Sequence, residues 1–167
     1  MTILSILRYP DPRLKTIAKE ITEFNGNLRN LAEDMAETMY KAGGIGLAAT
    51  QVNVHRQIFV VDVSSDKNKL QIYINPKIIE KRGTIEFEEG CLSIPETTAS
   101  IKRASYIKLL AADIQGEKIE VEAEGLLSVC IQHEIDHLKG VLFIDYLSRL
   151  KRDRIARRIL KAEREMS

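Results

Sequence analysis

The sequence predicts an α+β fold in which antiparallel or mixed sheets wrap around a buried central helix, with an N-terminal helix and a C-terminal helix in addition. Three observations lead to this expectation. Residues 125–143 are mostly apolar and have the character of a buried helix, which Gly140 is expected to close. Several short runs rich in β-branched and apolar residues precede that segment. Strands and helices do not alternate regularly, which argues against a parallel sheet.

The first part of the chain predicts an irregular arm followed by an amphipathic helix. The first 20 residues include a Y-P-D-P stretch, whose two prolines exclude a regular helix or a central strand. Asn25 or Asn27 is a suitable cap for the helix that follows, and the glycines at positions 43 and 44 are expected to end it. Its apolar stripe recurs at steps of three and four residues and consists of Leu28, Leu31, Ala32, Met35, Met39 and Ala42.

The middle of the chain predicts strands separated by polar turns. A turn is expected at Asn75-Pro76, and another at Cys91, which follows a glycine and precedes a segment that ends in a proline. The segment 44–51, GIGLAATQ, is rich in small residues and is expected to be a loop, because it lacks the spacing of a phosphate-binding motif. The strand candidates are residues 57–63, 70–75, 78–81, 84–88, 105–112 and 118–122.

Composition gives no sign of a nucleic-acid-binding or membrane protein. The 167 residues suit one domain, 1–167, with 44% hydrophobic residues, 29% charged residues and a net charge of +1. No apolar run approaches the roughly 18 residues of a membrane helix, and residues 1–20 lack the apolar region of a signal peptide. We therefore expect a cytoplasmic protein that binds neither DNA nor a membrane, with its two cysteines reduced.

Residues 147–167 predict a basic C-terminal helix. This segment contains eight Lys or Arg and three acidic residues, a local charge of about +5 (8 − 3). We expect one face to dock on the domain and the basic face to remain solvated. The expected apolar stripe consists of Ile155, Ile159, Ala162 and Met166.

The segment 132–137, QHEIDH, predicts a metal site on the central helix. His133 and His137 are four residues apart, so both imidazoles project from one helix face and can bind one ion. Glu134 follows the first histidine and can reach a water molecule without being a ligand. The alternative is a pair of core histidines without a metal, which this spacing around a glutamate disfavours.

The residues alone leave the remaining ligands open. Cys130 lies three residues before His133, so a set of Cys91, Cys130, His133 and His137 would make a closed structural zinc site. Cys91 with the two histidines would make an open catalytic site. Ordinary zinc proteases are disfavoured, because Phe143 occupies the position where one class has a third histidine.

Three segments together resemble the motifs of the peptide deformylase family: 44–51, 89–93 (EGCLS) and 132–137. Their order and separation also match, and the resemblance extends over essentially the whole chain. It implies a metal-dependent hydrolase that removes the formyl group from the N-terminal formylmethionine of new polypeptides and releases formate. The alternatives are a zinc endopeptidase and a non-catalytic, metal-stabilised binding module.

The resemblance also implies a role for each site residue. Glu134 would be general base and acid, while Gln51 and the backbone amide of Leu92 would hold the formyl oxygen. The metal, most readily Fe²⁺, with Zn²⁺, Ni²⁺ or Co²⁺ as substitutes, would be bound by Cys91, His133 and His137. The substrate backbone would pair with the segment containing Gly44, Ile45 and Gly46 and with Gly90, and the methionine pocket would include Ile45, Leu126, Val129 and Cys130.

The resemblance further implies that the basic C-terminal helix docks on the ribosome. The chain also departs from the family in two places. Gly43 replaces an acidic residue that some members have before the first motif. Thr97-Thr98 stands where some members have an arginine after the second motif, so contacts to the outer part of the substrate are in doubt.

Overall fold

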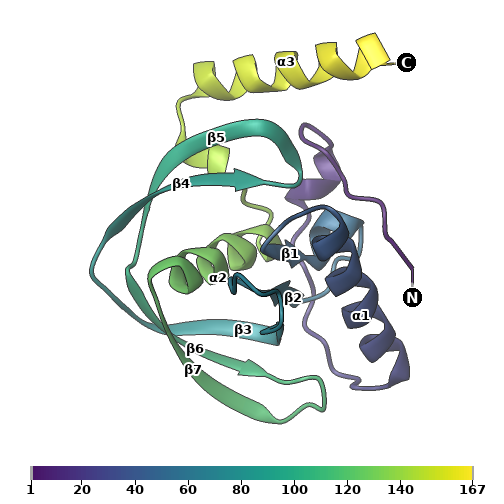
Figure 1. Cartoon of the computed structure of the whole chain (residues 1–167), viewed down its shortest axis with the longest axis vertical. Helices are drawn as coiled ribbons and strands as arrows, with labels where there is room; N and C mark the ends of the chain where they lie inside the picture. Colours follow the sequence, from purple (N-terminus) through teal and green to yellow (C-terminus); the bar gives the residue numbers. More distant parts are fainter. Residues whose placement is uncertain (1, 167) are drawn as a thin grey trace.

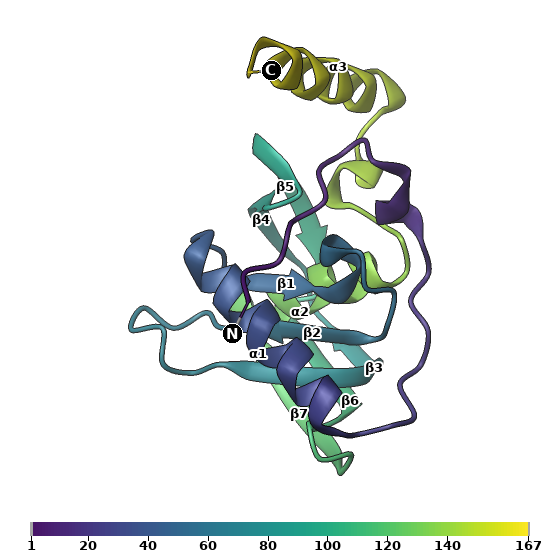
Figure 2. The same cartoon turned by 90° about the vertical axis from the view of Figure 1, so that its right-hand side faces the viewer.

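The computed structural model describes residues 2–166 and confirms the predicted α+β fold. Helix α2 (Gly125–Leu138) lies between two antiparallel sheets (Figures 1 and 2). The larger sheet has the order β1-β2-β3-β6-β7, and the smaller is the hairpin β4-β5. The strands are β1 (Gly46–Ala48), β2 (Ile58–Val61), β3 (Gln71–Arg82), β4 (Ile85–Cys91), β5 (Ile94–Arg103), β6 (Tyr106–Ala112) and β7 (Lys118–Glu124).

Two helices cover opposite faces of β2, which explains why all four of its residues are buried. Helix α1 (Gly26–Lys41) begins at Asn25, whose side chain accepts a hydrogen bond from the Leu28 amide at 3.1 Å. Ile58 and Val60 pack with α1, whereas Phe59 and Val61 pack with α2. Because side chains alternate along a strand, this short strand is enclosed on both faces by apolar neighbours.

The expected turn at Asn75-Pro76 is wrong, because both residues lie within the long strand β3. The pairing of β3 with β6 shifts register between Ile74 and Lys77, where Pro76 has no N–H to donate. Asn75 has a positive φ of 52°, and its side chain bonds to both the amide and the carbonyl of Ile21, each at 2.8 Å. A bulge tied to the N-terminal arm therefore replaces the turn.

Sequence analysis missed two strands. In the segment expected to be a loop, β1 forms because Gly46, Leu47 and Ala48 pair with Val61, Val60 and Phe59. In β5, Pro95 and several Thr and Ser residues hide the strand pattern. Because β5 pairs only with β4 among the described strands, Pro95 is tolerated there as at a sheet edge.

The C-terminal helix α3 (Arg149–Met166) docks by its middle and lies over β5 in Figure 1. Ile159 is buried in a cluster with Leu14, Ile94 and Phe143. The rest of the expected stripe is less buried: Ile155 is half-buried, Ala162 is exposed and Met166 is 83% exposed. A docked face along the whole helix was therefore a wrong expectation.

Three short 3-10 helices complete the chain: η1 (Pro12–Lys15), η2 (Ala49–Val52) and η3 (Phe143–Tyr146). The first belongs to the otherwise largely irregular N-terminal arm, as expected from its prolines. Within residues 2–166, no helix has both the length and the apolar character needed to cross a membrane.

The end of α2 depends on Gly140, which has a φ of +76°. A methyl group there would overlap the Lys15 carbonyl, whose carbon would lie 2.7 Å away. We expect Gly140→Ala to lower the free energy of unfolding by the cost of a left-handed residue, about 1–2 kcal/mol, and by a further ~1–3 kcal/mol of overpacking. Urea unfolding of the metal-loaded protein measures the loss.

The matched control for this prediction is Gly125→Ala. Gly125 also has a positive φ, +59°, but a methyl group there would meet no atom within 4 Å. Equal losses for the two variants would show that the contact between Gly140 and the N-terminal arm does not limit the end of α2.

Candidate metal centre

Two elements converge on the site. The histidines project from the buried face of α2, and Cys91 ends β4 where the β4-β5 hairpin turns. Cys91 pairs with Ile94 across a turn of two residues, and the Ser93 amide lies 3.4 Å from the Cys91 sulfur. The turn expected at Cys91 is therefore the hairpin itself, and it directs the thiol toward α2.

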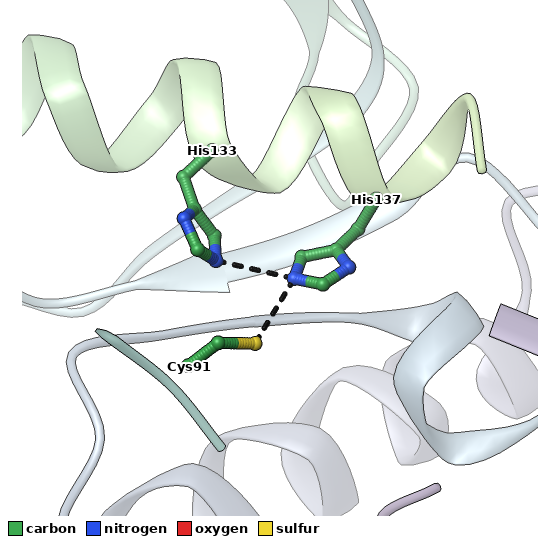
Figure 3. A group of neighbouring side chains, drawn as sticks. All are labelled: Cys91, His133 and His137. Carbon is green, nitrogen blue, oxygen red and sulfur yellow. Dashed lines mark hydrogen bonds between the residues drawn. The ribbon is translucent and has the colours of Figure 1, made fainter. Parts of the chain in front are cut away.

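Figure 3 shows Cys91, His133 and His137 facing one another. Nε2 of His137 lies 3.1 Å from Nε2 of His133 and 3.3 Å from Sγ of Cys91, and one ligand atom from each residue lies within 4.8 Å of the others. Metal–ligand bonds of about 2.0–2.3 Å in a tetrahedral site hold the ligand atoms about 3.3–3.6 Å apart. The three residues therefore fit one divalent metal ion, and they form a metal site.

Cys130 is not part of this cluster. Its thiol lies 3.9 Å from the carbonyl oxygen of Ile45, and burial raises its pKa well above the usual value. A thiol that stays protonated is a poor metal ligand. Among the described residues, the set that converges is Cys91, His133 and His137, so the closed four-ligand alternative has no support.

A buried carboxylate orients the first histidine. Oε1 of Glu89 lies 2.9 Å from Nδ1 of His133, which leaves Nε2 for the metal. Arg103 holds the same carboxylate through two hydrogen bonds of 2.5 and 2.9 Å. Burial opposes the charge of Glu89, yet the bonds from His133 and Arg103 keep its pKa below the usual value.

Arg103 also links β5 to α2. Its Nη1 donates to Asp136 at 2.8 Å, and the Tyr146 hydroxyl donates to the same carboxylate oxygen at 2.8 Å. Sequence analysis missed this supporting layer. Glu89 and Asp136 were inside the quoted motifs, but their partner Arg103 lies on the strand that the sequence pattern did not indicate.

Glu134 is buried beside the metal ligands and is 3% exposed. Burial raises the pKa of Glu134 to about 7. Among the residues that the structure describes, Oε1 of Glu134 has no hydrogen-bond partner. Gly46 makes room for it, because a methyl group at that position would overlap the carboxylate and lie 3.0 Å from its Cδ. The result is a carboxyl group ready to bind and release a proton near neutrality.

Gln51 holds the loop beside the metal ligands. Its Oε1 accepts the Ala48 amide at 2.9 Å, while its Nε2 lies 3.0 Å from Ser93 Oγ and 3.4 Å from Cys91 Sγ. The side chain is 1% exposed, so it is fixed by these contacts. Its amide N–H groups therefore face the Ser93 hydroxyl and the Cys91 thiol.

A cavity of about 430 Å³ opens at this centre. Such a volume is typical of small-ligand sites. It brings together the predicted site residues other than His137, which lies beside it in the metal cluster. They are Gly44, Ile45, Gly46, Gln51, Gly90, Cys91, Leu92, Leu126, Val129, Cys130, His133 and Glu134.

An open three-residue metal site with a buried carboxyl group of raised pKa beside it defines a metal-dependent hydrolase. Comparison with known proteins gives the family. The model of the polypeptide deformylase family matches residues 3–153.

The chain is 55% identical to the peptide deformylase of Buchnera aphidicola from Acyrthosiphon pisum, over 99% of this chain and 95% of that one. It is 52% identical to the peptide deformylase of Tolumonas auensis, over 98% of each. A peptide deformylase structure from Legionella pneumophila superposes with a TM-score of 0.93 at 44% identity, covering 99% of this chain and 98% of that one. The structure of the peptide deformylase from Ehrlichia chaffeensis in complex with actinonin also superposes with a TM-score of 0.93. The sequence identity is 38%, and the match covers 98% of this chain and 99% of that one.

The chain therefore belongs to the polypeptide deformylase family, and its activity is that of a peptide deformylase.

The two cysteines should respond differently to replacement by serine. We expect Cys91→Ser to weaken metal binding by more than the roughly 10–100-fold cost of disturbing an outer-shell partner, because a thiolate ligand is lost. Cys130→Ser should keep about one metal per chain. Elemental analysis after gel filtration checks both variants, and metal loss confined to Cys130→Ser would contradict the ligand set.

Proposed function

We propose that the enzyme removes the formyl group from the N-terminal formylmethionine of newly synthesised polypeptides and releases formate. The observation that carries this proposal is the meeting of the metal site, Glu134 and Gln51 at one end of a cavity of about 430 Å³. The lining includes Ile45, Leu126 and Val129, so an apolar side chain such as methionine fits next to the reacting centre.

Glu134 moves the proton. A bound divalent metal supplies Lewis acidity, which lowers the pKa of water toward neutrality. The Glu134 carboxylate accepts the proton of the attacking water and then donates it to the nitrogen of the leaving methionine. Its pKa of about 7, raised by burial, suits both steps, because the ideal general acid–base has a pKa near the operating pH.

Gln51 and Leu92 stabilise the charge that develops on the formyl oxygen. The Gln51 side chain is held by Ala48 and Ser93, so its N–H donors are oriented before the substrate binds. The backbone amide of Leu92 is the second donor, at the turn of the hairpin beside Cys91. Losing one such donor typically costs about 10²–10³ in turnover.

The substrate backbone extends the sheets. Strand β1 is at the edge of the larger sheet, and Ile45 just before it is 44% exposed. A peptide in the cavity can pair with residues 44–46 on one side and with Gly90 of β4 on the other. The methionine side chain then enters the pocket formed by Ile45, Leu126, Val129 and Cys130.

We infer that the metal is Fe²⁺, with Zn²⁺, Ni²⁺ or Co²⁺ able to replace it. A thiolate with two imidazoles suits each of these ions, so the ligand set agrees with iron without requiring it. Metal analysis of protein purified without oxygen is the direct test.

Glu134→Gln tests the hydrolase against a metal-stabilised binding module. The amide keeps the shape of the side chain but cannot act as a general base or acid. Turnover should therefore fall by about 10²–10⁴ while the metal stays bound. Formate release from formyl-Met-Ala-Ser and metal content are measured on the same samples.

Three outcomes separate the alternatives. Full formate release by the variant would remove the proposed role of Glu134. No formate release from the unaltered, metal-loaded protein would overturn the proposed reaction. Internal cleavage of unformylated peptides would indicate a zinc endopeptidase instead.

We also propose that α3 docks on the ribosome, in the cytoplasm where nascent chains emerge. The cations of the helix that a polyanion would attract include Arg149, Arg152, Arg157, Arg158 and Arg164. Two of them bind the domain itself, because Arg152 donates to the Asp145 carbonyl at 3.3 Å and Arg158 donates to Thr97. The support comes from the net basic charge of the helix and from the exposure of Arg157 and Lys161.

Charge variants test docking better than truncation does, because removing α3 would uncover the cluster around Ile159. We expect the double variant Arg157→Glu with Lys161→Glu to reduce co-sedimentation with bacterial ribosomes, and raised salt to do the same to the unaltered enzyme. Formate release from formyl-Met-Ala-Ser is the control for folding. Equal sedimentation of both proteins would exclude docking through this face.

A further inference from the structure

A second hollow, of about 780 Å³, lies between α3 and the edge of β5. We call it the α3–β5 groove. Figure 1 shows the two elements side by side at the end of the molecule away from β7. Its lining residues come from both elements and from the turn before α3: Glu96, Thr97, Thr98, Ala99, Ser100, Leu147, Lys151, Arg154, Ile155 and Arg158.

The α3–β5 groove adjoins the active-site cavity. Glu96, Thr97 and Thr98 line both hollows. Thr97 is buried and belongs to the wall that the two hollows share, whereas Glu96 and Thr98 are exposed. A peptide that extends from the cavity past these three residues would reach the groove.

The groove carries a net positive charge of about +2, from three cations and one acid among its lining residues (3 − 1). Lys151, Arg154 and Arg158 lie at steps of three and four on α3, so they share one face of the helix. The acid is Glu96, at the end nearer the cavity. Arg158 donates a hydrogen bond to Thr97 Oγ1, so its guanidinium is held against the shared wall.

We infer that the α3–β5 groove is a subsite for the outer residues of the formylated peptide, and that Arg154 and Arg158 give it a preference for Asp or Glu side chains there. The inference rests on the proposed function, because it extends the same substrate beyond its methionine. Charge complementarity selects the occupant, since exposed cations attract carboxylates and repel Lys and Arg.

The preference should depend on position. Glu88 and Glu96 line the cavity side, so an acidic residue next to the methionine gains nothing there. An extended peptide advances about 3.3 Å per residue, so the groove comes within reach only of later residues. The acid preference is therefore expected to be absent at the second residue and to appear farther along the peptide.

A positional scan tests this. The substrates are formyl-Met-Ala₆ peptides in which one alanine, from the second to the sixth residue, is replaced by Asp or by Lys. We expect kcat/KM for the Asp peptide to exceed that for the Lys peptide by about two- to five-fold at one or two outer positions, the effect of a partly exposed ion pair. Raising the salt concentration should reduce the ratio.

Variants assign the effect to the helix. Arg158→Glu or Arg154→Glu leaves two cations and two acids in the groove, a net charge of about 0 (2 − 2), so each should bring the Asp-to-Lys ratio at the outer positions close to one, whereas Arg158→Lys should preserve the ratio. Arg157→Glu is the matched control, because Arg157 faces a different hollow, lined also by Leu160, Lys161, Glu163 and Arg164. The Asp-to-Lys ratio of kcat/KM for Arg157→Glu should equal that of the unaltered enzyme.

The outcomes separate this inference from the proposed function. No formate from formyl-Met-Ala-Ser would overturn the proposed function itself. Normal turnover of that short peptide, with an equal ratio at every scanned position or with the same ratio in Arg158→Glu and Arg157→Glu, would overturn the subsite alone.

Discussion

The Glu89 carboxylate is the group on which the arrangement of the site depends. Its two oxygens accept hydrogen bonds from Arg103, and one of them also contacts Nδ1 of His133, so the carboxylate joins β4, β5 and α2 beside the metal ligands. Removing one partner of such a buried pair typically costs about 3–5 kcal/mol, because the other charge is left without compensation. Burying this charged carboxylate is unfavourable, but the carboxylate holds the ring of a metal-binding histidine in one orientation. Cys91, two residues after Glu89, is positioned by the same hairpin.

The close approach of backbone to side chains at two glycines is the second constraint on the site. Gly46 brings β1 against the Glu134 carboxylate, and Gly44 accommodates the Leu92 side chain. A side chain at Gly46 would push Glu134 away from the metal ligands or move β1 out of its pairing with β2. The same burial that shields Glu134 from bulk solvent raises its pKa to about 7. Close packing and the raised pKa of Glu134 are therefore consequences of one arrangement, in which Gly46 lies against this carboxyl group on the central helix.

The sequence predicted those parts of the fold and site that depend on local pattern. Helices α1 and α2, their ends and the two-histidine motif follow from spacing and from residues at the helix ends such as Asn25 and Gly140. Strand β5 was missed because an edge strand tolerates Pro95 and need not alternate in polarity. Because β5 was missed, the contacts of Arg103 with Glu89 and Asp136 were missed too. Such contacts between residues far apart in the sequence are a property of the tertiary structure. The resemblance to deformylases supplied what the residues alone left open, namely which cysteine binds the metal.

The docking of α3 by its middle has a consequence for how the enzyme uses its positive charge. Ile159 packs the helix over β5, and the cations of the helix lie in two different environments. Lys151, Arg154 and Arg158 line the groove that adjoins the active-site cavity, whereas Arg157 and Lys161 line another hollow. A helix anchored along its whole length would leave one outward basic face, suited to one partner. Under the two proposals made above, docking by its middle would give this short helix one face toward the peptide and another toward a polyanion.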